Sequence, residues 1–75
     1  MNKLILEYPT LGIVKKELSK YFPEVIEIIF KSQMDNIKEF EIIDYLVNAA
    51  GYYIEMFRAT DNARTTFIIH FKRKS

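Results

Sequence analysis

The sequence has no cysteine, and it has only two glycines, two prolines and one histidine. Without cysteine there can be no disulfide, no thiolate metal ligand and no cysteine nucleophile, and such a chain fits a reducing compartment. Two glycines are too few for a glycine-rich phosphate loop. His70 is the only histidine, whereas a metal site usually needs three or four protein ligands. We therefore expect no metal, no cofactor and no enzymatic activity.

Strong charge and long apolar runs are also missing. The formal net charge is +1, so bulk electrostatics gives no reason to expect binding to nucleic acid or to a membrane surface. No apolar run approaches the roughly 18 residues that a membrane span requires, and the N-terminal apolar stretch is too short for a signal peptide. The sequence predicts a soluble, cytoplasmic protein that does not bind membranes.

What the chain does have is enough apolar material for one small core. Hydrophobic residues make up 49% and aromatic residues 15% of 75 positions, which is typical of a folded domain rather than a disordered segment. This length is near the lower limit at which one core suffices without disulfides or metals. We therefore expect residues 1–75 to form a single domain.

The spacing of apolar residues predicts six elements in the order strand, helix, strand, helix, strand, strand. The expected strands are a short one with Leu4 and Leu6 facing inward, then 25–31, 52–60 and 65–72, with a turn around Asp61 and Asn62. The first helix is expected from Pro9 to just before Pro23, with the apolar stripe Leu11, Val14, Leu18 and Phe22. The second is expected to bury Ile37, Phe40, Ile43, Val47 and Ala50, and to end at a left-handed Gly51.

Two amphipathic helices and one sheet predict an α+β fold. We expect a two-layer α/β sandwich of β-α-β-α-β-β order, with a four-stranded mixed sheet and both helices on one face. The other face would then be open. It is expected to carry Ile29, Tyr53, Phe57 and Ile68 among charged residues, which is more apolar than a solvent face requires. Scattered exposed side chains and a partner or dimer surface both explain this composition.

The junction between the first strand and the first helix is the most distinctive stretch. Pro9 suits the first helical position, which places Tyr8 at the N-cap, where unpaired N–H groups and the positive end of the helix dipole meet. An anion or a thiolate fits such a position, but the residue here is a phenol. Tyr8 would either hydrogen-bond a partner or fill the site by packing. The N–H groups of Thr10, Leu11 and Gly12 would bind an anion or only water.

With these features the chain resembles the TusA/SirA family of small sulfur-carrier proteins. Tyr8-Pro9-Thr10-Leu11 stands in place of the family's Cys-Pro-x-Pro motif and retains only its first proline. The segments Val14-Lys15-Lys16-Glu17-Leu18 and Asn48-Ala49-Ala50-Gly51-Tyr52 are similar to the family's lysine-bearing helix and to the stretch before its terminal hairpin. The resemblance implies the family's scaffold and a docking surface around the first helix. It does not imply persulfide transfer, because a phenol cannot carry the sulfur.

Three functions follow as hypotheses. The first is a non-catalytic, regulatory domain that binds another protein or a second copy of itself. It would use Tyr8, Pro9, Thr10, Gly12 and Lys16, or the open sheet face. The second is an RNA-binding module, since the element order also resembles the C-terminal domain of translation initiation factor three and several lysines would meet phosphate. An enzyme using Tyr8 or His70 is the least favoured, because no acid, base and anion site are grouped together.

Overall fold

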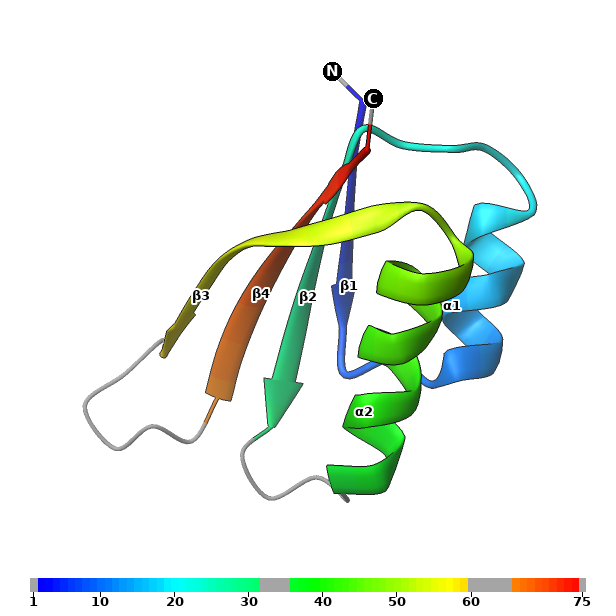
Figure 1. Cartoon of the computed structure of the whole chain (residues 1–75). Coiled ribbons are helices and arrows are strands. Elements are labelled where there is room, and N and C mark those ends of the chain that lie inside the picture. The colour runs from blue at the N-terminus through cyan, green and yellow to red at the C-terminus, as the bar shows by residue number, and fades with distance from the viewer. Residues whose placement is uncertain (1, 32–35, 60–65, 75) are drawn as a thin grey trace.

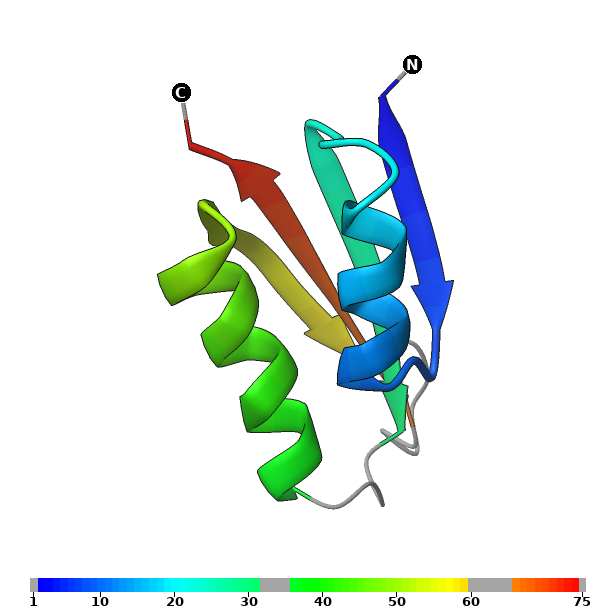
Figure 2. The same ribbon diagram turned by 90° about the vertical axis from the view of Figure 1, so that its right-hand side faces the viewer.

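The computed structural model describes residues 2–31, 36–59 and 66–74. In these ranges two helices and a four-stranded sheet form two layers, with both helices on the same face of the sheet (Figures 1 and 2). The elements are β1 (Lys3–Glu7), α1 (Leu11–Leu18), β2 (Val25–Lys31), α2 (Asn36–Asp44) continued by the π-helical turn η1 (Tyr45–Ala49), β3 (Tyr52–Ala59) and β4 (Thr66–Arg73). The predicted fold class is confirmed.

The sheet has the strand order β1-β2-β4-β3, in which β1 and β2 are parallel and the other neighbours are antiparallel. Inward and outward residues alternate along β1 and β2 as the sequence predicts, with Leu4 buried and Ile5 56% exposed. The side chains of the core are Leu4, Val14, Ile26, Ile28, Phe30, Ile42, Leu46, Tyr52, Ile69 and Phe71. The core therefore lies between the sheet and the two helices.

The first helix is shorter than predicted, because it ends at Leu18 instead of next to Pro23. Ser19 ends it. Its N–H donates to the carbonyl of Lys15 at 3.0 Å, and its hydroxyl donates to the carbonyl of Lys16 at 2.6 Å. Serine competes for backbone groups in this way, so the helix stops before the proline acts. Phe22, predicted on the helical stripe, lies beyond the helix.

The segment after α1 is held to the ends of β3 and β4 by four residues, which we call the Tyr52 cluster: Phe22, Pro23, Tyr52 and Arg73. The hydroxyl of Tyr52 donates to the carbonyl of Pro23 at 2.6 Å, and Nη1 of Arg73 donates to the carbonyl of Phe22 at 2.6 Å. The Phe22 and Tyr52 rings meet edge to face at 5.3 Å. Burial raises the pKa of Tyr52 to about 12, although the Arg73 charge opposes this shift and Tyr21 adds to it.

The second helix buries a different stripe from the predicted one. Ile42 and Leu46 are fully buried, whereas Ile37 and Phe40 are 69% and 67% exposed. Three other members of the predicted stripe, Ile43, Val47 and Ala50, are only partly buried against the core. Apolar residues lie on more than one side of this helix, so its periodicity fits two stripes. The π-helical turn η1 adds to the difference, since it departs from the 3.6-residue repeat.

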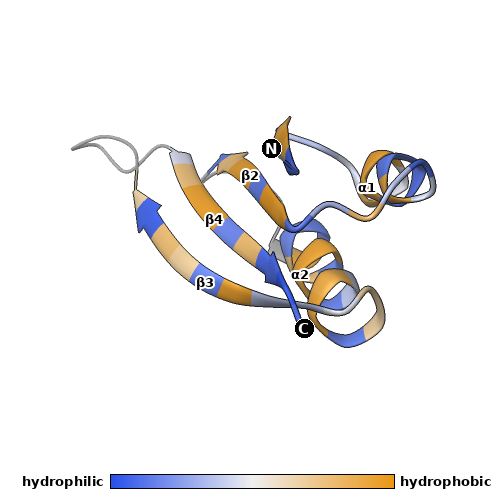
Figure 3. Cartoon of the chain, turned by 90° about the horizontal axis from the view of Figure 1, so that it is seen from above, coloured by the Kyte–Doolittle hydropathy of each residue, from blue (hydrophilic) through white to orange (hydrophobic). Residues whose placement is uncertain are grey.

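The final hairpin starts at Gly51, which has the predicted left-handed conformation with φ of 87°. The predicted turn at Asp61 and Asn62 lies outside the described residues. Apolar and polar segments interchange along β3 and β4 (Figure 3), but a bulge between Ile54 and Met56 breaks the alternation of β3. Beyond the bulge, Phe57 is opposite Ile69 in β4. Residues directly opposite share a face, so the prediction that Phe57 lies on the open face is wrong.

Candidate binding site between the two helices

The chain changes direction sharply at Tyr8, between β1 and α1. Tyr8 has φ of 52°, a left-handed conformation that is uncommon for a residue with a side chain. Its N–H donates to the carbonyl of Ile29 at 2.9 Å, which extends the pairing of β1 with β2 by one residue. Pro9 follows and is buried. This bend carries the chain from the sheet layer to the helix layer.

Thr10 is the N-cap of α1, so the prediction that Tyr8 caps a helix opened by Pro9 is wrong by two residues. Thr10 is extended, and its hydroxyl oxygen accepts from the N–H of Ile13 at 3.2 Å. Its carbonyl accepts from the N–H of Val14 at 3.1 Å. Threonine is among the preferred N-cap residues because its oxygen satisfies a free N–H of the first turn. This gain decides the helix start over the preference of proline for the first helical position.

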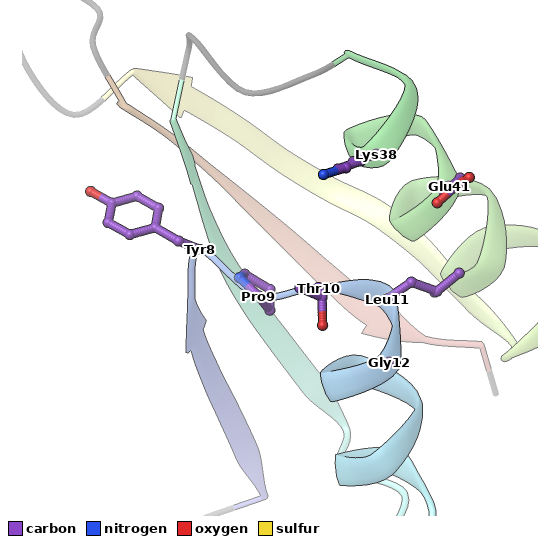
Figure 4. A pocket seen from close by; sticks show the side chains of 7 residues that line it. All are labelled: Tyr8, Pro9, Thr10, Leu11, Gly12, Lys38 and Glu41. Atoms are coloured by element: carbon purple, nitrogen blue, oxygen red, sulfur yellow. The ribbon is translucent and has the colours of Figure 1, made fainter.

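The ring of Tyr8 points away from the start of α1 (Figure 4). Nζ of Lys31 lies 4.6 Å from the ring centroid, a cation–π contact between β2 and the bend. The side chain is 37% exposed. The phenol therefore does not fill the space at the helix start, and its backbone end is the part that borders that space.

A pocket of about 480 Å³ lies beside this bend, between the start of α1 and the first half of α2. Seven residues line it: Tyr8, Pro9, Thr10, Leu11, Gly12, Lys38 and Glu41. Leu11 extends from α1 toward α2, while Lys38 and Glu41 come from successive turns of α2 (Figure 4). A Cβ atom built on Gly12 would lie 3.8 Å from the hydroxyl oxygen of Thr10, so there is free space over this first turn.

The pocket offers binding chemistry rather than covalent chemistry. Its side chains supply one ammonium group, one carboxylate and the apolar surface of Pro9 and Leu11. The hydroxyl of Thr10 is already engaged by the N–H of Ile13. Opposite charges at the rim of an apolar pocket orient a ligand that has an apolar body and a polar end. No thiol stands anywhere in the sequence.

Sequence reasoning found part of this site. Of the predicted partner-binding residues, the structure brings Tyr8, Pro9, Thr10 and Gly12 to the pocket, while Lys16 is exposed on α1 and is not part of its lining. Leu11 was assigned to the core, and it lines the pocket as well. Lys38 and Glu41 carried no signal in the sequence, because their place depends on how α2 packs beside α1.

The open face of the sheet holds the second group of predicted residues. Ile29 in β2 and Ile68 in β4 are directly opposite each other and half-buried, and Tyr53 in β3 is 41% exposed. Ion pairs cross the same face. Oε1 of Glu27 lies 3.0 Å from Nε2 of His70 and 3.5 Å from Nζ of Lys3. Despite this approach, Nε2 of His70 makes no hydrogen bond.

Several of the lysines on which the RNA-binding hypothesis depends are engaged within the fold. Lys20 pairs with Glu17 at 2.9 Å, and Lys72 lies 3.9 Å from Glu55. Nζ of Lys15 lies 5.3 Å from the centroid of the Tyr45 ring. These contacts reduce the positive charge available to a phosphate backbone, and they give the RNA-binding hypothesis little support.

These features define a small, cysteine-free α+β domain with a pocket between its helices. Comparison with protein-family models, curated protein sequences and solved structures gave no match. Over the described ranges, neither helix has the length and apolar character needed to cross a lipid bilayer. Among the same residues, no three His, Asp or Glu side chains gather where they would hold a metal ion together.

Proposed function

We propose that this chain is a non-catalytic, cytoplasmic protein-binding domain of TusA/SirA-like architecture, and that its partner binds at the pocket between α1 and α2. One observation carries the proposal. The pocket forms at the segment Tyr8-Pro9-Thr10-Leu11 and contains no thiol, and the resemblance aligns this segment with the Cys-Pro-x-Pro motif of the sulfur carriers. On this proposal the site still binds a protein partner but cannot transfer sulfur.

The chemistry of the pocket indicates what part of a partner it receives. Pro9 and Leu11 provide apolar surface, and Lys38 and Glu41 provide opposite charges. A side chain with an apolar stem and a charged or amide end, presented by the partner, satisfies both. A protein partner also reaches beyond the pocket to Lys16 on the exposed side of α1, where the family resemblance implies docking.

Gly12 offers a matched test of this site. Because a Cβ atom there meets only ordinary van der Waals contact, Gly12→Ala leaves the pocket open, whereas Gly12→Trp fills it. We expect partners captured by the immobilised full chain to bind Gly12→Ala like the unmodified protein. Gly12→Trp should weaken that binding at least tenfold, as measured by calorimetry with the purified partner. Circular dichroism controls for folding, and equal affinity for both variants would place the partner elsewhere.

The RNA-binding alternative is separated by its dependence on salt. Binding to phosphates weakens steeply as salt concentration rises, because counterions are released on binding. With lysines engaged by Glu17, Glu27 and Glu55, we expect no binding to single-stranded RNA oligonucleotides at physiological ionic strength. Fluorescence anisotropy measures this directly. Tight binding with a steep salt slope would replace the protein-binding proposal.

A further inference from the structure

Two apolar surfaces border the β3 edge of the molecule without cover from the described part of the chain. The first is the outer stripe of α2, which consists of Ile37 and Phe40, 69% and 67% exposed. The second is the distal half of β3, residues 54–59, in which Ile54 is 45% and Phe57 is 58% exposed. In Figures 1 and 2, α2 is the helix on the β3 side of the helix layer, and β3 starts beside the end of α2 and curves away from the helix layer.

The distal half of β3 continues the core face of the sheet. Ile54 is opposite Phe71 and Phe57 is opposite Ile69, and both β4 residues belong to the core. Ile54 and Phe57 therefore lie on the face that the helices cover elsewhere. The Phe57 ring stacks on that of Phe67 at 5.3 Å. This part of the sheet has the composition of a helix-covered surface, but no described helix lies over it.

The outer stripe of α2 is turned away from the rest of the domain. Ile42 and Leu46 point to the sheet and are fully buried. Lys38 and Glu41 border the pocket beside α1. Successive helix residues are rotated by about 100°, so Phe40 falls on the remaining side, away from both the sheet and α1. In the described part of the chain the outer stripe of α2 is therefore largely exposed, and so is the apolar face of the distal half of β3.

We propose that a second copy of this chain covers both surfaces in a two-fold symmetric dimer. In such a dimer the distal half of β3 and the outer stripe of α2 of each copy pack against the same two elements of the other. A two-fold interface is self-complementary, because each patch meets its counterpart on the partner. In the described part of each copy both the distal half of β3 and the outer stripe of α2 are exposed, so one interface would bury both.

The charges on β3 favour an antiparallel approach of the two strands. Glu55 and Arg58 are exposed and lie three residues apart in this edge strand, and Oε2 of Glu55 is 3.9 Å from Nζ of Lys72 in the same copy. When two such strands run antiparallel around a two-fold axis near Phe57, each Glu55 comes close to the partner copy's Arg58, and this pair occurs twice. The bulge at Ile54 and Met56 interrupts regular backbone pairing, so side-chain packing holds the interface together.

The exposed area is of the size that a stable dimer needs. A typical interface buries about 800 Å² on each partner, of which roughly 60% is apolar. Large side chains that are about half exposed contribute roughly 100 Å² each. Four of them lie on these two surfaces: Ile37, Phe40, Ile54 and Phe57. Their combined surface of about 400 Å² approaches the apolar part of a typical interface.

The oligomeric state of the full chain in solution tests the proposal. We expect sedimentation equilibrium to give a dimer at micromolar concentrations, and Phe57→Lys and Phe40→Lys each to shift the protein to monomer by at least a hundredfold in dissociation constant. The control variants are Tyr53→Lys on the same strand and Ile5→Lys, at positions 41% and 56% exposed on the open face. Both controls should remain dimeric.

A protein that stays monomeric at hundreds of micromolar, or a dimer broken by Ile5→Lys but not by Phe57→Lys, would overturn the proposal. Circular dichroism shows whether each variant is folded, and both lysines enter exposed positions. The dimer is independent of the pocket between the helices. Gly12→Trp should therefore leave the dimer intact, so a failed pocket and a failed dimer are distinguishable.

Discussion

The two halves of the region that α2, η1 and β3 form contain similar apolar residues, but one half buries them and the other leaves them exposed. In one half, Leu46 and Tyr52 are fully buried and the Tyr52 cluster closes over the end of the sheet. In the other, Phe40 and Phe57 are 67% and 58% exposed. Apolar content alone therefore does not decide burial in this protein. What decides it is whether another element packs against the apolar side chains, and among the residues that the structure describes only the closed half has such an element.

The largest expected effect on stability comes from comparing Leu46, in the closed half, with Phe40, in the exposed half. Leu46→Ala should lower the free energy of unfolding by about 2–5 kcal/mol, because it leaves a cavity in a fully packed site. Phe40→Ala should lower it by less than about 0.5 kcal/mol in the monomer, since its ring is exposed. Urea denaturation of both variants in the Phe57→Lys background, which is expected to be monomeric, measures the two effects. A costly Phe40→Ala in the monomer would mean that the helix buries the stripe predicted from sequence.

The next effect concerns the Tyr52 cluster. Tyr52→Phe removes the buried hydroxyl and leaves the Pro23 carbonyl without its donor. We expect a loss of about 1–3 kcal/mol, the usual penalty for a buried polar group that loses its partner. The matched control is Tyr53→Phe, because Tyr53 follows in the chain and is 41% exposed. It should change stability by less than about 0.5 kcal/mol. Equal losses of stability in both variants would mean that the Tyr52 cluster is not what closes this end of the sheet.

Tyr52 also makes the stability of the protein depend on pH. The pKa of Tyr52 is raised to about 12 in the folded protein, whereas an unfolded tyrosine titrates near 10. Between these values the unfolded chain releases the proton and the folded chain keeps it, so stability falls as pH rises through this window. The full loss attributable to Tyr52 is about 3 kcal/mol. It is measured as the difference between the unmodified protein and Tyr52→Phe, which should be less sensitive across the window.

Much of the fold could be predicted from the sequence because its signals are local. Alternation marks Ile26, Ile28 and Phe30 as inward residues, and all three are buried. Gly51 fits the left-handed position that it occupies. The second helix was misjudged because two apolar stripes fit its pattern, and choosing between them requires knowing which one meets the sheet. Phe57 was misjudged because one bulge reverses every later side chain.

The residues of the candidate site that are adjacent in sequence could be predicted, but those that a second helix contributes could not. The stretch from Tyr8 to Gly12 drew attention through its single proline and its place before a helix, and it does line the pocket. The cap was misplaced because two local preferences compete, and the Thr10 hydroxyl prevailed over Pro9. Lys38 and Glu41 come from a helix that is distant in sequence, so only the packing of α1 beside α2 assigns them to the site.

The smallest expected effect compares the two glycines, one at the closed end and one at the pocket. Gly51 has φ of 87° and a Cβ atom there would lie 3.8 Å from the Phe22 ring, so space is available and the cost of Gly51→Ala comes from the backbone. We expect a loss of about 1–2 kcal/mol. Gly12→Ala in α1 should raise stability by about 0.5–1 kcal/mol, because alanine favours a helix. Thermal unfolding measures the change in stability of both variants. The two changes should have opposite signs if Gly51 must keep its left-handed conformation at the turn into β3. They should have the same sign if that turn adjusts to a side chain.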